Sequence, residues 1–297
     1  MARVGVVGLG HIGGAVAANL VADGHTTTVT DLDASRAAGI DGATAVASVA
    51  EVARASEIVV TSLPGPAVVA TVARDWAEAA EPGSILLDLS TTSPESNRDV
   101  AGQLAATGHH LVEAPLTGGA VGARGRTLVF MVGGDEEPVA RVRPLLDQLG
   151  RATFHVGPVG AGTTMKLANS LLAFACTCAS LEALSMAAAA GIDLRTAVEV
   201  VRTGGASNFY IDRSVESIDV RGGSVQFALE LAAKDAGLIQ EAAATSGVPS
   251  PVGDAVLAVL ADAVGRGLGG CDWGDLVVAA EARSGQALVL TKPGEAG

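Results

Sequence analysis

A short glycine-rich loop near the start of the chain constrains the fold more than any other feature. The segment Gly8–Gly13, GLGHIG, has glycines at its first, third and sixth positions. It follows the apolar run Arg3–Val7 and begins Gly13–Ala22, a stretch with helical spacing. In a strand–loop–helix unit, these glycines permit a tight turn, close approach of the backbone to a pyrophosphate, and close helix–strand packing. The sequence therefore predicts a dinucleotide-binding Rossmann unit.

An acidic residue supports the same interpretation. Asp31 ends the next predicted strand, where dinucleotide-binding domains place a carboxylate that binds the adenosine ribose hydroxyls. Its charge repels a 2′-phosphate, and Asp33 adds further negative charge, with Arg36 as the only nearby cation. We therefore expect NAD in preference to NADP as the cofactor. The residues expected to contact it here are Gly8, Gly10, His11, Ile12, Gly13 and Asp31.

Apolar runs alternate with Ala-rich helical segments through the first half of the chain. This alternation predicts an α/β domain with a mostly parallel sheet and helices on both faces. Runs such as IVVTSL and ILLDL are typical of strands buried on both sides. The predicted strands are Arg3–Val7, Thr27–Thr30, Ile58–Ser62, Ile85–Asp88, His110–Glu113, Leu128–Val132 and Thr153–His155. The predicted helices among them are Gly13–Ala22, Pro66–Ala80, Pro94–Thr107 and Glu136–Gln148.

The pattern changes after Gly162, beyond which helical segments replace strands. A long helix is predicted over Thr163–Ala190, with Gly191 as its C-cap. The further predicted helices are Asp193–Val201, Asn208–Ser217, Leu229–Ser246, Pro251–Val264 and Gly274–Arg283. We therefore predict an NAD-binding Rossmann domain over residues 1–161. An all-helical substrate and dimerisation domain over residues 162–297 is expected to begin with the long interdomain helix and end in a frayed polar tail, TKPGEAG.

Composition and charge limit the class of protein. Hydrophobic residues make up 49% and charged residues 17% of the 297 residues, as in packed globular chains. The formal net charge of −13 disfavours binding to nucleic acid or anionic membranes. The longest uncharged stretch, Leu167–Leu181, is shorter than a membrane span, so we expect a buried helix there. The start of the chain lacks the apolar run of a signal peptide, and a cytoplasmic location is expected.

The cysteines predict neither a disulfide framework nor a metal site. Cys176, Cys178 and Cys271 are three in number, so they cannot all pair within the chain. The first two lack the further cysteine or histidine ligands that a zinc site needs. We expect free thiols in a reducing compartment.

Four further segments carry a family resemblance. They are DLSTTSP over Asp88–Pro94, EAPLTGG over Glu113–Gly119, GAGTTMKLANS over Gly160–Ser170 and LAAKD over Leu231–Asp235. With the N-terminal glycine loop, these motifs resemble the β-hydroxyacid dehydrogenase family over nearly the whole chain. The chain is most similar to the 3-hydroxyisobutyrate dehydrogenase branch, which includes tartronate semialdehyde reductases.

The resemblance implies roles for particular residues. Lys166 corresponds to the family's catalytic lysine. The segment Thr117, Gly118 and Gly119 corresponds to the family's substrate-anchoring Ser-Gly-Gly. The residues implied to lie beside the cofactor are Leu63, Pro64, Ser90, Thr91 and Lys234, the last paired with Asp235.

Chemical reasoning about Lys166 agrees with that role. Oxidation of an alcohol releases a proton, which requires a general base, and the chain has no histidine after His155. A lysine can act as the base if desolvation or a neighbouring cation lowers its pKa. Lys166 opens a nearly uncharged helix, where its charge opposes the helix dipole, and such a position is easier to explain if the charge is functional. The Thr117–Gly119 segment offers N–H groups and a hydroxyl to a carboxylate, or forms an ordinary turn.

Two assignments stay open in the sequence. The family commonly has asparagine four residues after the lysine, whereas this chain has Asn169 at three and Ser170 at four. Both lie one helical turn beyond Lys166, so either side chain is a candidate for contact with the substrate. Arg124 follows the anchoring segment and either holds a second anionic group or is simply exposed.

The sequence favours an NAD-dependent enzyme that interconverts a small 3-hydroxy acid and its semialdehyde or keto form. Lys166 is expected to be the general acid and base, in a cleft between the two domains. The alternatives are an imine reductase or a reductase of another small aldehyde acid on the same fold, and a non-catalytic NAD-binding protein. Both Lys166 and Asp31 argue against an imine reductase. The resemblance further implies a homodimer or homotetramer.

Overall fold

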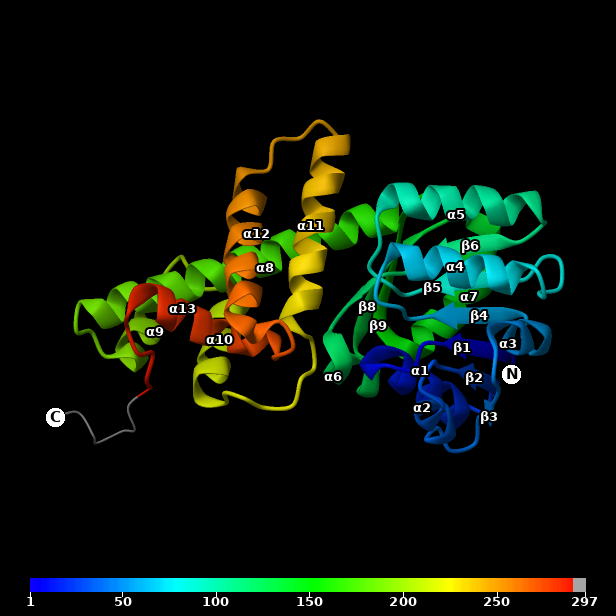
Figure 1. Ribbon diagram of the computed structural model, residues 1–297, viewed down its shortest axis with the longest axis horizontal. Helices are drawn as coiled ribbons and strands as arrows, with labels where there is room; N and C mark the ends of the chain where they lie inside the picture. Colours follow the sequence, from blue (N-terminus) through cyan, green and yellow to red (C-terminus); the bar gives the residue numbers. More distant parts are fainter. Residues whose placement is uncertain (291–297) are drawn as a thin grey trace. The chain divides into compact units, whose positions relative to one another are not determined.

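The computed structural model describes residues 1–290, and the tail predicted to fray lies outside them (Figure 1). The chain divides into two compact units, a first unit over Met1–Lys166 and a helical unit from Leu167 onward. The first unit contains a mostly parallel sheet with helices, and the second consists of helices. The predicted fold class is thereby confirmed. The domain boundary at residues 161 and 162 stays a prediction.

The sheet of the first unit contains nine strands. Their bounds are β1 Arg3–Val7, β2 Thr26–Thr30, β3 Thr44–Ala45, β4 Ile58–Thr61, β5 Ile85–Asp88, β6 His110–Glu113, β7 Leu116–Thr117, β8 Leu128–Gly133 and β9 Gly150–Gly157. The strand order is β3-β2-β1-β4-β5-β6-β8-β7, with β9 paired to β8. Strands β1 to β6 pair in parallel, whereas β8 is antiparallel to β6 and β7. The order reverses between β1 and β4, which is where open α/β sheets bind ligands.

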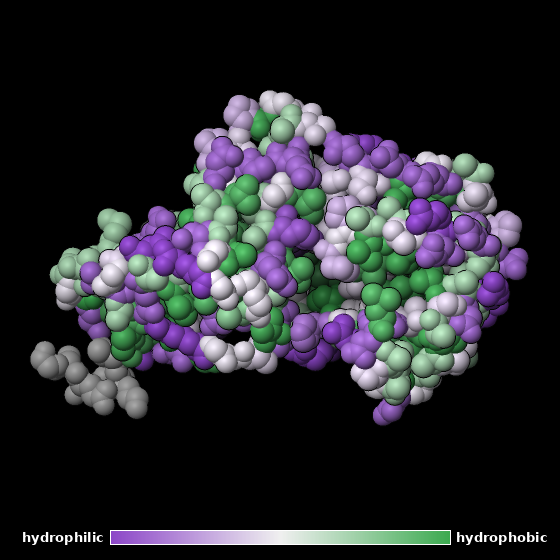
Figure 2. All heavy atoms as spheres, viewed as in Figure 1, coloured by the Kyte–Doolittle hydropathy of each residue, from purple (hydrophilic) through white to green (hydrophobic). Residues whose placement is uncertain are grey.

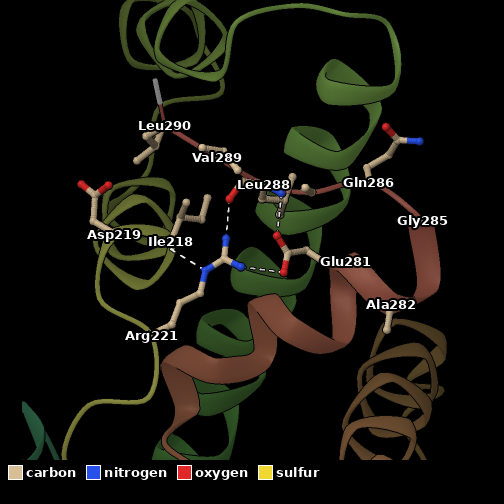
Figure 3. Close-up of a pocket in the computed structure, with 11 residues that line it drawn as sticks. Ile218, Asp219, Arg221, Glu281, Ala282, Gly285, Gln286, Leu288, Val289 and Leu290 are labelled. Carbon is tan, nitrogen blue, oxygen red and sulfur yellow. Dashed lines mark hydrogen bonds and ion pairs between the residues drawn. The ribbon is translucent and has the colours of Figure 1, made fainter. Parts of the chain in front are cut away.

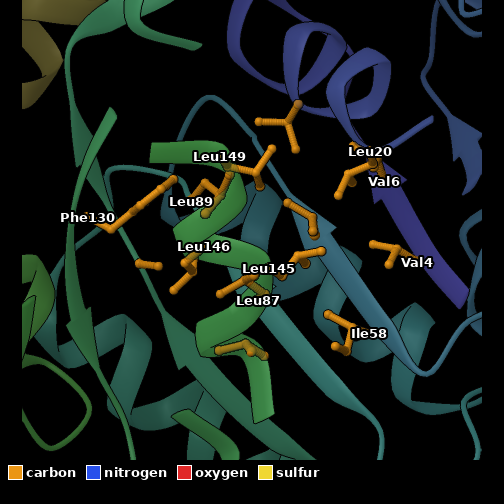
Figure 4. Close-up of a cluster of buried hydrophobic side chains, with 14 of the residues drawn as sticks. Val4, Val6, Leu20, Ile58, Leu87, Leu89, Phe130, Leu145, Leu146 and Leu149 are labelled. Atoms are coloured by element: carbon orange, nitrogen blue, oxygen red, sulfur yellow. The ribbon is translucent and has the colours of Figure 1, made fainter. Parts of the chain in front are cut away.

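Helices cover both faces of this sheet. Their bounds are α1 His11–Ala22, α2 Ala34–Ala38, α3 Val49–Ala55, α4 Pro66–Ala77, α5 Pro94–Ala106, α6 Gly119–Arg124 and α7 Glu136–Leu149. Since successive side chains of a strand point to opposite faces, the buried strands supply two cores. Val4 packs in one cluster with Leu20 of α1 and Leu146 of α7 (Figure 4). Leu86 packs in the other cluster with Trp76 of α4.

The helical unit has its own core. Its helices are α8 Ala161–Ala189, which begins in the first unit, α9 Leu194–Thr203, α10 Phe209–Asp219, α11 Leu229–Thr245, α12 Pro251–Ala263 and α13 Leu276–Ser284. Short helices at Val264–Leu268 and Trp273–Asp275 connect the last two. The core is formed by apolar faces of helices α8 to α13, including Leu167, Leu194, Ile211, Leu229 and Leu260.

Helix α8 differs from the predicted buried helix. Leu167, Phe174 and Leu181 are buried along one face, whereas Leu172 and Met186 are largely exposed. Figure 2 shows hydrophobic residues among hydrophilic ones on the visible face of this unit. At 29 residues, α8 is long and apolar enough to cross a membrane by length and composition alone, a property that core helices of soluble proteins share. The helix predicted over Thr163–Ala190 therefore agrees with α8 to within two residues at each end, but one face of it is exposed where the sequence led us to expect a buried helix.

Candidate functional site

The glycine loop lies directly after β1, and its three glycines serve different purposes. Gly8 has a φ of +86°, and a Cβ on Gly13 would lie 1.9 Å from the carbonyl oxygen of Gly8, so the fold itself requires both glycines. A Cβ on Gly10 would meet no described atom within 4 Å. Gly10 is exposed and is the N-cap of α1, and no side chain within residues 1–290 caps this helix. The first N–H groups of α1 are therefore available to an anion.

Asp31 lies beside this loop, as the sequence predicted for the end of the second strand. Its Oδ2 accepts a hydrogen bond from the amide of Leu9 at 2.6 Å, and its Oδ1 accepts one from Asp33 at 2.8 Å. Arg36 approaches Oδ2 at 3.9 Å but is exposed. The carboxylate is thus fixed against the loop by backbone donors. The open space at Gly10, the uncapped helix and this carboxylate together fit a dinucleotide.

Two predicted cofactor loops are joined by one serine. The amide of Leu63, after β4, donates a hydrogen bond to Ser90 Oγ at 2.9 Å. The Ser90 hydroxyl in turn donates to Asp88 Oδ1 at 2.6 Å, and Thr61 donates to the same oxygen at 2.7 Å. The loops at Leu63–Pro64 and Ser90–Thr91 are therefore brought together at the carboxyl ends of β4 and β5.

Asp88 itself is fully buried at the end of β5. Its Oδ2 has no hydrogen-bond partner within residues 1–290. Burial raises the pKa of this carboxyl above its usual value, and the nearby Glu113 raises it further, against the hydrogen bonds from Ser90 and Thr61. Sequence reasoning did not single out this residue.

Glu113 is a second buried carboxylate, at the end of β6. Its Oε1 accepts backbone hydrogen bonds from Gly160 at 2.7 Å, Gly162 at 2.8 Å and Thr163 at 3.2 Å. Its Oε2 accepts from the Thr163 hydroxyl at 2.8 Å and from the side-chain amide of Asn97. The sequence included Glu113 only as the end of a predicted strand and the first residue of the EAPLTGG segment. Its place at the carboxyl end of a predicted strand was the available signal, and nothing in the sequence pointed to Asn97.

The residues proposed for chemistry fall in both units. In the first unit, Lys166 is half-buried near the start of α8, three residues after Thr163. Thr117 is half-buried and precedes Gly118 and Gly119, which are exposed and have φ values of +118° and +60°. This left-handed backbone turns the chain into α6 and requires glycine. The exposed Arg124 ends α6.

The remaining predicted residues belong to the helical unit. Ser170 is buried with Leu167 on one face of α8, whereas Asn169 is half-buried. Lys234 Nζ lies 2.8 Å from Asp235 Oδ1 on α11, and the Asp235 side chain is almost completely buried. The predicted lysine–aspartate pair is therefore an ion pair in contact.

A cavity of about 720 Å³ lies elsewhere in the helical unit and contains none of the predicted site residues. Arg221 lines it and donates hydrogen bonds to Glu281 at 2.7 Å and to the carbonyl oxygen of Leu288 (Figure 3). Glu281 also accepts from the Leu288 amide at 2.6 Å. These contacts hold the segment after α13 against the helices, so the guanidinium here has a structural role.

The parallel sheet, the glycine loop at its switch point and the acidic end of β2 define a dinucleotide-binding Rossmann domain, followed here by a helical unit. Residues 3–157 match a family model described as the NAD binding domain of 6-phosphogluconate dehydrogenase. Residues 160–279 match one described as NAD-binding of NADP-dependent 3-hydroxyisobutyrate dehydrogenase. The chain belongs to the β-hydroxyacid dehydrogenase family, in the group of the 3-hydroxyisobutyrate dehydrogenases, as its motifs predicted.

Named relatives act on different small hydroxy acids. The NAD-dependent L-serine dehydrogenase of Pseudomonas aeruginosa is 33% identical over 87% of this chain and 91% of its own length. The 2-(hydroxymethyl)glutarate dehydrogenase of Eubacterium barkeri is 35% identical over 84% of this chain and 85% of its own. A solved structure of the Mycobacterium tuberculosis 3-hydroxyisobutyrate dehydrogenase with L-serine superposes with a TM-score of 0.85 at 28% identity, covering 94% of this chain and 98% of that one. The chain is thus an oxidoreductase of the hydroxyacid dehydrogenase type with an NAD(P)-binding domain.

Proposed function

We propose that this protein interconverts a small 3-hydroxy acid, similar to 3-hydroxyisobutyrate, and its semialdehyde or keto form, with NAD as the preferred cofactor. The observation that carries the proposal is the place of Lys166. This lysine is half-buried at the start of a helix whose first amides are held by the buried Glu113. The same unit carries the glycine loop and the Thr117–Gly119 segment.

Proton transfer and substrate orientation are assigned to the chain's own residues. NAD, when bound, supplies the hydride acceptor for oxidation of the alcohol carbon. Lys166 takes the hydroxyl proton during oxidation and returns it to the carbonyl oxygen during reduction. Thr117, Gly118 and Gly119 orient the substrate carboxylate through a hydroxyl and backbone N–H groups. Of the two residues one turn beyond the lysine, Asn169 is the more accessible and is proposed to contact the substrate, with the buried Ser170 supporting it.

The cofactor contacts are proposed on the same basis. The uncapped N-terminus of α1 receives the pyrophosphate beside Gly10, and Asp31 binds the ribose. The negative charge of Asp31 is the argument for NAD over NADP. The further contacts proposed are Gly8, His11, Ile12, Gly13, Leu63, Pro64, Thr91 and Lys234. We also propose a cytoplasmic homodimer or homotetramer, as the family resemblance implies.

The test combines a substrate panel with one variant. Wild-type protein is assayed with NAD and with NADP against 3-hydroxyisobutyrate, L-serine, 2-(hydroxymethyl)glutarate and glycerate, following NAD(P)H absorbance. Lys166→Met is expected to lower kcat by about 10²–10⁴-fold, the usual contribution of a general acid or base. Its affinity for NADH, measured by fluorescence titration, should stay close to that of the wild type.

Two results would reject the proposal. If Lys166→Met turns over at the wild-type rate, Lys166 is not the general acid and base. Reduction of cyclic imines with NADPH, without oxidation of any hydroxy acid, would instead favour the imine reductase alternative.

A further inference from the structure

A buried carboxylate holds the start of the helix that carries Lys166. The three amides that Glu113 Oε1 binds belong to Gly160, Gly162 and Thr163, at distances of 2.7, 2.8 and 3.2 Å. Because α8 begins at Ala161, the last two are among the N–H groups that a helix cannot satisfy internally. A carboxylate at this end also interacts favourably with the helix dipole.

The other carboxylate oxygen connects this turn to a cofactor loop. Glu113 Oε2 accepts from Asn97 Nδ2 and from the hydroxyl of Thr163, whose Oγ1 lies 2.9 Å from Asn97 Nδ2. Asn97 Oδ1 accepts from the Thr92 hydroxyl at 2.8 Å. These four side chains are all buried. Thr92 follows Thr91 directly, so the cluster joins the loop after β5 to the first turn of α8.

The backbone packs closely around the Glu113 carboxylate. A Cβ on Gly133 would lie 2.3 Å from Glu113 Oε1 and 2.9 Å from the amide nitrogen of Gly162. A Cβ on Gly162 would lie 2.4 Å from the carbonyl oxygen of Met131. Glycine is therefore required at positions 133 and 162. A side chain at either position would prevent strand β8, the start of α8 and the Glu113 carboxylate from lying this close together.

We propose that Glu113 is a positioning residue for Lys166. Four of its five hydrogen bonds fix the start of α8. The fifth, from Asn97, fixes that turn relative to the loop after β5 through the bond between Asn97 and Thr92. Glu113 does not itself touch the reacting atoms. The inference rests on the proposed role of Lys166 as the proton-transfer group. A displacement of about 1 Å in such a group can lower turnover by about 10²-fold.

The test exchanges the carboxyl group of residue 113 and the amide group of residue 97. In Glu113→Gln, the side-chain nitrogen faces Asn97 Nδ2, so two donors oppose each other. We expect kcat to fall by about 10- to 100-fold with the KM for NAD nearly unchanged. In the double variant Glu113→Gln/Asn97→Asp, the bonds among residues 113, 97 and 163 can re-form with donor and acceptor exchanged, while the backbone amides and the Thr92 hydroxyl donate as before. Most of the lost kcat should therefore return in the double variant.

A second measurement needs neither cofactor nor turnover. Amide hydrogen exchange in the cofactor-free protein reports whether the first turn of α8 is held. For the peptide that contains Gly160, Gly162 and Thr163, exchange is expected to be about tenfold faster in Glu113→Gln and to return toward the wild-type rate in the double variant.

A stability control separates positioning from general weakening of the fold. Leu104→Ala creates a cavity under α5, outside the cluster, and lowers the melting temperature without changing any of these hydrogen bonds. Its kcat per folded molecule should equal that of the wild type. The proposal fails if Glu113→Gln keeps the wild-type kcat and exchange rate. It also fails if kcat does not recover in the double variant, or if Leu104→Ala loses as much kcat as Glu113→Gln. If Lys166→Met is inactive while Glu113→Gln is normal, only the positioning role fails; if Lys166→Met is fully active, the proposed function fails instead.

Discussion

Asp88 and Glu113 occupy paired positions at the ends of the adjacent parallel strands β5 and β6, and both side chains are fully buried. Their surroundings differ. Within residues 1–290, Glu113 receives donors on both carboxylate oxygens, whereas Asp88 receives them only on Oδ1. Burial is the main reason that the pKa of Asp88 is raised, and the charge of Glu113 adds to it. The pair therefore combines a carboxyl group with donors on both oxygens and one whose pKa is raised by burial.

The raised pKa of Asp88 predicts a specific dependence of stability on pH. A carboxyl with a raised pKa in the folded state binds more protons there than in the unfolded chain between its usual 3.8 and the folded value. Its contribution is fully present below pH 3.8 and is lost as the pH rises through the folded pKa. In urea unfolding from pH 4 to pH 8, the free energy of unfolding of the wild type should therefore fall relative to that of Asp88→Asn.

Asp99→Asn provides the matched comparison for the loss of a carboxylate, because Asp99 is exposed on α5. The free energy of unfolding of the wild type minus that of Asp88→Asn should fall from pH 4 to pH 8. If it stays constant or rises with pH, Asp88 is not the group responsible.

The glycine loop predicts opposite outcomes for two single-methyl substitutions. In Gly13→Ala, the new Cβ meets backbone atoms of Gly8 at 1.9 and 3.0 Å, so the melting temperature should fall sharply. In Gly10→Ala, the Cβ meets no described atom, and the melting temperature should stay within a few degrees of wild type. The methyl would instead occupy space needed by the phosphates, and the Kd for NADH should rise at least about tenfold.

Gly102→Ala is the control for adding a methyl group at an open position. Gly102 lies within α5, where a Cβ has free space, so alanine is expected to stabilise the protein by about 0.5–1 kcal/mol. NADH affinity should not change. If Gly10→Ala binds NADH as tightly as the wild type, the pyrophosphate does not lie beside Gly10.

The sequence could predict the parts of the site that depend on local patterns. The glycine loop and Asp31 are adjacent to strands with clear apolar runs, and the strand–loop–helix context makes them recognisable. Strands β3 and β7 were missed because two residues cannot display an alternating pattern. The exposed face of α8 was missed because an almost uniformly apolar helix does not indicate which side is covered.

The Glu113 cluster could not be predicted for a different reason. Asn97 is 16 residues from Glu113, and Thr163 is 50 residues away, so only the folded sheet brings them together. Asn97 lies in the polar segment PESNRDV, where it resembles any solvent-exposed helix residue. Its almost complete burial is visible only in the structure.

Cys178 is expected to be chemically inert in the folded protein. Burial raises the pKa of this thiol to about 11, so about a thousandth of it is thiolate at pH 8. Cys178→Ser should therefore leave the number of thiols that react with Ellman's reagent unchanged in the native protein. In guanidinium chloride the same variant should show one reactive thiol fewer than the wild type. A lower count in the native variant would contradict the assigned burial.

The charge of Asp31 is predicted to be the basis of the preference for NAD over NADP. In Asp31→Asn, the carbonyl oxygen can still accept the hydrogen bond from Leu9, while the charge that repels a 2′-phosphate is removed. The ratio of kcat/KM for NAD to that for NADP should fall at least about tenfold, equivalent to about 1.4 kcal/mol. The gain for NADP should shrink in Asp31→Asn/Arg36→Ala, because Arg36 is the cation nearest to this carboxylate. The exposed Asp41→Asn serves as the control for removal of one negative charge. An unchanged ratio in Asp31→Asn, or a wild type that prefers NADP, would show that this carboxylate does not select the cofactor.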